Sequence, residues 1–381
     1  MERAQRTRSG VLARATLLAG VVLFVPPVDI ARAGASPETA AANLPGPILG
    51  SPPGITAGPD GNLWFTELSG NRIGRITPGV PNTITEFAVP TPGGGPGDIV
   101  TGPDGNLWFT EFGGNKIGRI TPGAPHTITE FALPTADSRP VGIVTGPDGN
   151  LWFTEQGNDT IGRIEPGAPH TITEFALAAG RAPEDIAPGP DGNLWFTGGD
   201  SIGRISPALP NTITEFPVPT AGSEPAGLVS GPDGNLWFTE LGGGRIGRIT
   251  PGAPNTITEF AVPTAAGAPR SIAAGPDGNL WFTEMGGNRI GRILLGAPNT
   301  VTEFAVPTAG STPRGIAAGP DGNVWFTEIA GNRIGRITPG APNTITEFPL
   351  APPSGPGAAP DAAIPGIFRR RPGSAGDGGL P

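Results

Sequence analysis

Six repeated glutamates and two arginines are the first candidates for a chemical role in this sequence. Six glutamates directly follow the letters W-F-T, and Arg270 and Arg314 each stand just before a short apolar segment. Carboxylates held close together favour a bound divalent cation or protonation, and oxygen ligands suit Mg²⁺ or Ca²⁺. The alternative interpretation is a set of solvated strand ends. The glutamates are Glu67, Glu111, Glu155, Glu240, Glu284 and Glu328.

A sequence motif that recurs seven times predicts the β-strands on which these residues lie. The letters G-P-D-G-N-[LV]-W-F-T return every 42 to 44 residues, and every tryptophan of the chain lies in one of them. A period in the low forties with several short β-like segments is typical of a β-propeller blade. We therefore expect an all-β fold: a seven-bladed β-propeller with four antiparallel strands per blade over residues 51–350. Since the last repeat carries its own fourth strand, we expect the first and last blades to pack face to face without strand exchange.

The first repeat shows how one blade is predicted. Strands A to D are expected over 53–56, 63–66, 73–76 and 83–87, with Pro, Asp and Gly forming the turn between A and B. The tryptophan of strand B is interpreted as core between blades rather than as a platform for sugars. The strand C arginines and strand D glutamates, such as Arg75 and Glu86, are expected to pair across neighbouring strands. His126 and His170 fill a turn position that holds asparagine in the other blades, so they are interpreted as turn residues.

One face of this propeller gathers the residues that differ between blades. Strands A and B form a hairpin, so the start of A and the end of B lie on the same face, here called the top face. The start of strand A supplies charges in only some of the blades, and we expect these residues to form a ligand site. Glu284 and Glu328 are the candidate metal ligands, and Arg270 and Arg314 are also the candidate catalytic residues. The ligand-binding candidates are Glu184, Asp185, Glu224, Arg270 and Arg314.

The ends of the chain and its charge limit its location and partners. Residues 1–33 combine a basic start, an apolar run and Ala-Arg-Ala, which is typical of a cleaved signal peptide. We expect a secreted protein without a membrane anchor, with a linker over 34–50 and a disordered Pro/Gly-rich tail over 351–381. The whole chain carries −9 and the first 33 residues carry +3, so the remainder carries −12. This charge disfavours nucleic acid, and the absence of cysteine excludes disulfides. We expect a monomer with a small-molecule or protein ligand on the top face.

The repeat text resembles that of the virginiamycin B lyase (streptogramin lyase) family. The resemblance rests on W-F-T-E, N-[RK]-I-G-R-I, I-T-E-F-x-[VL]-P-T and P-x-G-I, and it extends from Pro52 to Leu350. It implies a seven-bladed propeller, and active members of the family use Mg²⁺ to open the lactone ring of type B streptogramins by elimination.

The residues that the resemblance marks as active are mostly replaced in this chain. The family's first-blade tyrosine falls at Pro53, its sixth-blade histidine at Arg270, and its seventh-blade glutamate and histidine at Thr312 and Arg314. Only the strand B glutamate of the seventh blade matches, as Glu328. Arginine has no acceptor and stays protonated, so it could stabilise an enolate-like charge but could not abstract a proton.

Three functions remain open from the sequence. The first is a non-catalytic propeller that binds a ligand or partner on its top face. The second is a Mg²⁺-dependent lyase of the family, with Glu328 and Glu284 as the metal ligands. The third is a metal-dependent lactonase similar to the gluconolactonase group, for whose Glu, Asn and Asp ligands we find no clear equivalent. Whether the chain is an enzyme is therefore undecided at this stage.

Overall fold

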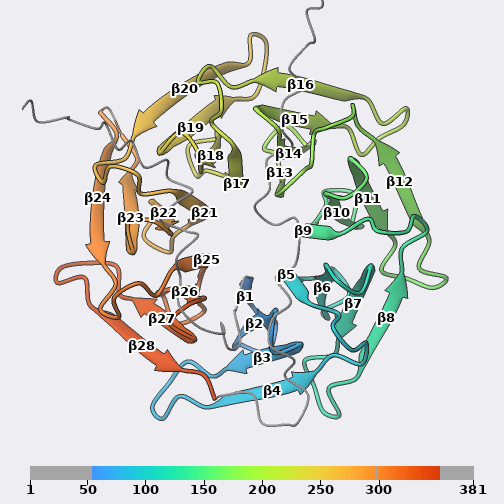
Figure 1. Ribbon diagram of the computed structural model, residues 1–381, viewed down its shortest axis with the longest axis horizontal. Coiled ribbons are helices and arrows are strands. Elements are labelled where there is room, and N and C mark those ends of the chain that lie inside the picture. The colour runs from blue at the N-terminus through green and yellow to red at the C-terminus, as the bar shows by residue number, and fades with distance from the viewer. Residues whose placement is uncertain (1–53, 297, 352–381) are drawn as a thin grey trace, which may run out of the picture. The chain divides into compact units, whose positions relative to one another are not determined.

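The computed structural model describes residues 54–296 and 298–351, and these form seven four-stranded antiparallel sheets arranged around a central axis (Figure 1). The chain divides into two units, 1–36 and 37–381. The predicted signal peptide (1–33) and linker (34–50) lie outside the described residues, as does the predicted tail (351–381) apart from its first residue, so they stay predictions. The described part contains no helix, and so none long and apolar enough to cross a membrane.

Each blade uses four consecutive strands, which confirms the predicted seven-bladed, all-β architecture. The innermost strands, A, are β1 (Ile55–Ala57), β5 (Pro96–Thr101), β9 (Pro140–Thr145), β13 (Ile186–Pro188), β17 (Pro225–Ser230), β21 (Pro269–Ala274) and β25 (Pro313–Ala318). The B strands are β2 (Leu63–Glu67), β6 (Leu107–Glu111), β10 (Leu151–Glu155), β14 (Leu194–Gly198), β18 (Leu236–Glu240), β22 (Leu280–Glu284) and β26 (Val324–Glu328).

The outer half of each blade is formed by strands C and D. The C strands are β3 (Arg72–Ile76), β7 (Lys116–Ile120), β11 (Thr160–Ile164), β15 (Ser201–Ile205), β19 (Arg245–Thr250), β23 (Arg289–Leu294) and β27 (Arg333–Ile337). The D strands are β4 (Ile84–Ala88), β8 (Ile128–Ala132), β12 (Ile172–Ala176), β16 (Ile213–Pro217), β20 (Thr256–Ala261), β24 (Thr300–Ala305) and β28 (Ile345–Pro349).

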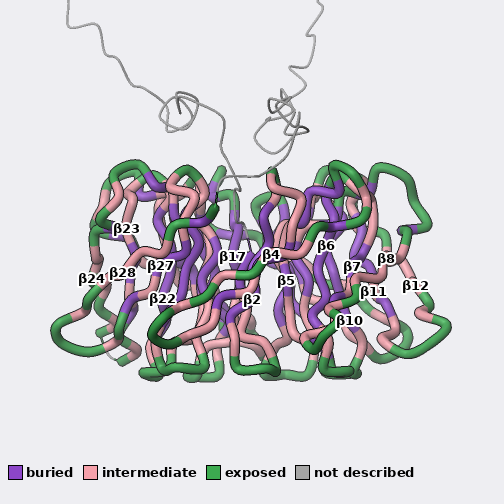
Figure 2. The backbone as a smooth tube through the Cα atoms, turned by 90° about the horizontal axis from the view of Figure 1, so that it is seen from below, coloured by how far each residue is buried: buried purple, intermediate pink, exposed green. Residues whose placement is uncertain are grey.

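The core lies between blades and is built from the repeated tryptophans. Trp64 of blade 1 is fully buried and packs with Ile99, Leu107 and Phe109 of blade 2. Its indole Nε1 donates to Asp60 Oδ1 at 3.0 Å, which satisfies its polar atom. Buried residues accordingly fill the middle of the blades, while the turns at both ends are exposed (Figure 2). The prediction that the tryptophans form core between blades is confirmed.

The ring closes by face packing, as predicted. Trp325 and Ile334 of blade 7 join Ile55, Leu63 and Phe65 of blade 1 in one buried cluster. Every strand of blades 1 and 7 pairs within its own sheet in the described part of the chain.

The predicted pairing between strand C arginines and strand D glutamates is wrong in register. Arg75 lies opposite Thr85, and its guanidinium stacks 5.6 Å from the Trp64 ring. Glu86 instead forms an ion pair at 2.5 Å with Arg72, at the start of strand C. The cause is the alternation of side chains along a strand, which puts residues 72 and 75 on opposite faces of the sheet.

The two histidines are turn residues, as predicted. His126 adopts a positive φ of 54°, and its Nδ1 lies 3.3 Å from the Thr121 carbonyl oxygen. Its ring packs 4.6 Å from Phe87 of the preceding blade, and His170 repeats the arrangement against Phe131.

Candidate functional site at the channel mouth

Two adjoining hollows open near the central axis on the face where the A strands begin. Their volumes are about 390 and 510 Å³, including the solvent at their openings. Both are lined by Gly97, Val141, Glu184, Arg270 and Arg314, which occupy one equivalent position in blades 2, 3, 4, 6 and 7. We call this region the channel mouth. It brings together four of the residues selected from the sequence: Glu184, Asp185, Arg270 and Arg314.

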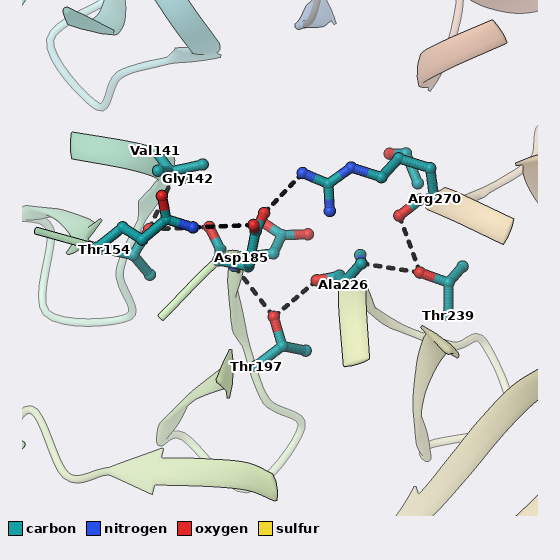
Figure 3. Close-up of polar contacts among 12 residues, drawn as sticks. Val141, Gly142, Thr154, Asp185, Thr197, Ala226, Thr239 and Arg270 are labelled. Atoms are coloured by element: carbon teal, nitrogen blue, oxygen red, sulfur yellow. Dashed lines mark hydrogen bonds and ion pairs between the residues drawn. The ribbon is translucent and has the colours of Figure 1, made fainter. Parts of the chain in front are cut away.

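An ion pair spans the mouth. Arg270 donates to Glu184 Oε2 at 2.6 Å, reaching from blade 6 to blade 4 past the small Ala226 of blade 5 (Figure 3). Burial opposes ionisation of both groups, but the attraction between them prevails. The pKa of Glu184 is therefore lowered, and the pKa of Arg270 is raised. Gln156 donates to the other Glu184 oxygen at 3.0 Å, so this carboxylate is satisfied on both sides.

Arg314 is different, because among the described residues its guanidinium has neither a hydrogen bond nor an ion pair within 4.0 Å. Burial and the neighbouring Arg270 charge lower its pKa to about 10, while Glu184 and Asp98 attract it from a longer distance. It therefore stays protonated at neutral pH. Within the described part of the chain, the donors of this guanidinium are therefore available to a ligand.

Two aspartates complete the charged group. Asp185 accepts from the backbone N–H of Ile186 and of Leu228 in the next blade, both at 2.8 Å. Asp98 accepts in the same way from Ile99 and Ile143, at 2.8 and 3.2 Å. Burial nevertheless raises the pKa of Asp98 to about 6, and burial together with the Asp98 charge raises the pKa of Asp185 to about 7.

A chain of threonine hydroxyls holds the channel mouth in place (Figure 3). In each blade the strand B threonine accepts from a backbone N–H at or near the start of strand A. Among the described residues, six of these threonines also donate to a carbonyl of the next blade. Thr239 thereby holds the Arg270 carbonyl at 2.8 Å, and Thr283 holds that of Arg314 at 2.7 Å. The other donors to carbonyls, at 2.5 to 2.9 Å, are Thr66, Thr110, Thr154 and Thr197.

β-bulges direct the two arginines. The pairing of β21 with β22 shifts between Pro269 and Ile272, and that of β25 with β26 shifts between Pro313 and Ile316. The residue before each proline has a positive φ, 48° at Ala268 and 56° at Thr312. That conformation is costly for residues other than glycine. The same bulge recurs in blades 2, 3 and 5, where the residue before the proline also has a positive φ. The bulge therefore belongs to the repeat and sets the direction of whichever side chain follows the proline.

An apolar wall borders the arginines on the side of blades 1 and 2. Leu68 and Phe112 directly follow the strand B glutamates of these blades, and both line the first hollow with Gln156 of blade 3. Sequence reasoning missed these three residues and Asp98. Asp98 carried a signal, since it replaces the glycine of P-x-G-I in blade 2 just as Asp185 does in blade 4.

The remaining candidates lie away from the mouth. Glu224 is exposed on the loop before β17 and lines neither hollow. Glu284 and Glu328 lie inside blades 6 and 7 with no exposed surface, and they line neither hollow. All six strand B glutamates are 0–1% exposed, so they are not the solvated strand ends that the sequence left open.

The described residues do not fit a Mg²⁺ ion at the channel mouth. Among them no group of three or more His, Cys, Asp or Glu side chains is arranged to hold a metal. The mouth itself holds two guanidinium groups, which repel a divalent cation, and Glu184 is already paired with one of them. No chemical step is therefore assigned to a metal.

The threonine chain gives a first testable expectation. Thr283→Val keeps the side-chain shape but leaves the Arg314 carbonyl and the Ser271 N–H without their partner. We expect a loss of about 1–3 kcal/mol in the free energy of unfolding, measured by urea denaturation. Thr300→Val, at an exposed position of β24 in the same blade, is the control and should change stability by less than about 0.5 kcal/mol. Equal effects of the two variants would contradict the role given to Thr283.

Comparisons with known proteins agree with the fold. Residues 28–208 and 170–362 match the sequence profile of the virginiamycin B lyase family. A virginiamycin B lyase structure from Staphylococcus aureus is 40% identical, covers 76% of this chain and 95% of its own, and superposes with a TM-score of 0.69. A catalytically inactive variant of that enzyme with quinupristin is similar at 40% identity, 78% and 97% coverage and a TM-score of 0.69.

More distant structures share the fold alone. Hydrazine synthase from Kuenenia stuttgartiensis is 18% identical, covers 80% of this chain and 96% of its own, and has a TM-score of 0.61. A search of curated proteins gave no match.

Proposed function

This chain belongs to the virginiamycin B lyase family, and on that premise we propose that it is a secreted propeller that binds a small anionic ligand at the channel mouth instead of opening a lactone. The observation that carries the proposal is Arg314. Its guanidinium lines both hollows and has no hydrogen bond or ion pair among the described residues. An unpaired cation in a partly dry site attracts an anion more strongly than one in water.

The residues at the mouth favour binding over elimination. Elimination needs an acceptor for a proton on carbon, and neither Arg270 nor Arg314 can provide one. The carboxyl oxygens of Asp98, Glu184 and Asp185 all receive hydrogen bonds already. Positioned arginines without a free base suit recognition of an anion rather than proton abstraction.

One observation keeps the lyase as a second candidate. The pKa of Asp185, raised to about 7 by burial and by Asp98, lies in the range that suits a general base at neutral pH. If the protein is a lyase, Asp185 is the residue that would take the proton, with Arg270 and Arg314 stabilising the developing negative charge.

Quinupristin distinguishes the two candidates. The full chain is incubated with quinupristin, with and without Mg²⁺, and the products are separated by reversed-phase chromatography, with Staphylococcus aureus virginiamycin B lyase as the positive control. We expect quinupristin to remain intact under both conditions. Conversion that disappears in Asp185→Asn would overturn the proposal and establish the lyase alternative.

The binding half of the proposal needs a separate measurement. Acetate is titrated into the protein and followed by nuclear magnetic resonance of the Arg side chains. We expect shifts in the wild type that are lost in Arg314→Gln. Arg336→Gln serves as the control, because Arg336 stacks on Trp325 within blade 7, away from the hollows. Acetate shifts that persist without Arg314 would contradict the assignment.

A further inference from the structure

The channel mouth contains more than a cation, and the groups around Arg314 limit what its ligand can be. We infer that the mouth is a site for a monocarboxylate that carries an apolar group, with the carboxylate on Arg314 and the apolar group against Leu68 and Phe112. This inference rests on the proposed function, since it specifies the ligand class of the same site.

The number of free cations sets the charge of the ligand. Arg270 is committed to Glu184 at 2.6 Å, which leaves Arg314 as the free guanidinium among the described residues of the mouth. Asp98 and Asp185 line the second hollow beside it. A dianion such as a phosphate monoester would meet one free cation and these carboxyl groups, so its second charge would be repelled. One negative charge therefore suits the site.

The geometry of Arg314 favours a carboxylate among monoanions. A guanidinium presents a planar fork of donors that matches the two oxygens of a carboxylate. Thr283 holds the backbone carbonyl of Arg314, and Arg314 lines both hollows. The fork therefore suits one planar anion in these hollows.

The apolar wall determines the rest of the ligand. Leu68 is half-buried and Phe112 is 9% exposed, and both line the same hollow as Arg314. Arg139 lies over the Phe112 ring at 6.0 Å, a cation–π contact. A small carboxylate such as acetate would leave this wall in contact with water, whereas a carboxylate with a larger aryl or alkyl group would cover it. Burial of apolar surface contributes about 25 cal/mol per Å², so the apolar group adds substantially to affinity.

The repeat supplies a matched pair of variants. Leu68 and Leu241 occupy the same position, directly after the strand B glutamate, in blades 1 and 5, and both are half-buried. Leu68 lines the hollow and Leu241 does not. Truncation of either side chain to alanine therefore costs similar packing, but only Leu68→Ala removes part of the wall.

The test is isothermal titration calorimetry of the full chain with phenylacetate, acetate, phenylacetamide and phenyl phosphate. We expect phenylacetate to bind at least about tenfold more tightly than acetate, which is a difference of about 1.4 kcal/mol. Phenylacetamide, which lacks the charge, and phenyl phosphate should bind more weakly than phenylacetate. Leu68→Ala should reduce the preference for phenylacetate over acetate at least about threefold, and Leu241→Ala should leave it unchanged.

The pH gives an independent readout. Asp98 and Asp185 carry raised pKa values, about 6 and 7. Asp98 acts on Arg314 together with Glu184 and Arg270, and Asp185 lies beside Asp98 and Arg270 in the same hollow. As the pH falls from 8 to 6, protonation of these aspartates removes negative charge that competes with the ligand. Phenylacetate should therefore bind more tightly at pH 6 than at pH 8, and Asp185→Asn should weaken this dependence.

The outcomes separate this inference from the proposed function. Equal, Arg314-dependent binding of acetate and phenylacetate overturns the inference and leaves the proposed function in place. Tighter binding of phenyl phosphate than of phenylacetate also overturns it. If no carboxylate binds in an Arg314-dependent manner, both the inference and the proposed function are wrong.

Discussion

Raising the pH from 5.5 to 8.5 is expected to lower the melting temperature of this protein by about 10 °C or more. The cause is the set of glutamates that end the B strands. Burial, together with the neighbouring strand D glutamate, raises the pKa of Glu67 and Glu284 to about 8 and that of Glu111, Glu240 and Glu328 to about 7. Both carboxyl oxygens of Glu111 and Glu240 are buried without a hydrogen-bond partner among the described residues.

The sign follows from the unfolded state, in which these groups ionise near their ordinary value of 4.5. Below that pH both states are protonated and stability is complete. As the pH rises, the unfolded chain loses protons that the folded chain keeps, so stability falls until the folded groups ionise near pH 7–8. Each unit of difference in pKa is worth about 1.4 kcal/mol, and several groups contribute in the same direction.

A single isosteric change tests the cause. Glu284→Gln removes the ionisation, so its stability relative to the wild type should increase by about 3 kcal/mol as the pH rises from 5.5 to 8.5. Glu165→Gln, at a C-to-D turn, is the control and should leave the pH dependence unchanged. A wild-type melting temperature that is constant across this range, or a Glu284→Gln variant whose stability relative to the wild type does not increase with pH, would refute the explanation.

The second large effect is expected from a glycine that faces an aromatic ring. Gly247 of β19 lies directly opposite Phe238 of β18, and a Cβ added at Gly247 would lie 2.0 Å from Phe238 Cζ. Phe238 is fully buried between blades, so its ring cannot move aside. We expect Gly247→Ala to cost about 3 kcal/mol or more, at the upper end of the usual cost of overpacking, measured by urea denaturation.

Two comparisons make this expectation specific. Gly167→Ala is the control, because an added Cβ there meets nothing within 4 Å and should change stability by less than about 0.5 kcal/mol. Phe238→Leu in the Gly247→Ala background should recover part of the loss, since the shorter side chain vacates the clash. A Gly247→Ala variant within 1 kcal/mol of the wild type would show that the ring has room to shift.

The fold could be predicted from the sequence because the blades repeat. A tryptophan at the same place in each period had to be core, and Pro-Asp-Gly turns marked the hairpins. The expected ion pair between Arg75 and Glu86 does not form, although the two residues lie on neighbouring strands. Which charges meet depends on the register of β3 with β4, and this register places Gly74 opposite Glu86. The length of the turn between β3 and β4 sets this register, and the register decides which charged side chains lie opposite each other.

The site was only partly predictable for a related reason. Residues that differ between blades, such as Glu184 and Arg270, were found by comparing repeats, and the structure places both at the mouth. The strand B glutamates led to the prediction of a metal site, because the same glutamate occurs in six blades. Their identity suggested one shared metal site, whereas each lies inside its own blade against that blade's strand D glutamate. Whether an end-of-strand side chain turns toward the axis or into the blade depends on local backbone geometry.

The threonine hydroxyl chain also makes this propeller suitable as an engineering scaffold. The residues at the mouth are held through their backbone carbonyls by Thr66, Thr110, Thr154, Thr197, Thr239 and Thr283. The positions held in this way already contain glycine, valine, glutamate, alanine and arginine in one chain. A combinatorial library randomised at 141, 184, 226, 270 and 314 would therefore vary the chemistry of the mouth while the frame keeps its anchors. Gly97 stays fixed, because a Cβ added there would lie 2.8 Å from Thr110 Oγ1. New binding specificities could be selected from it without redesign of the blades.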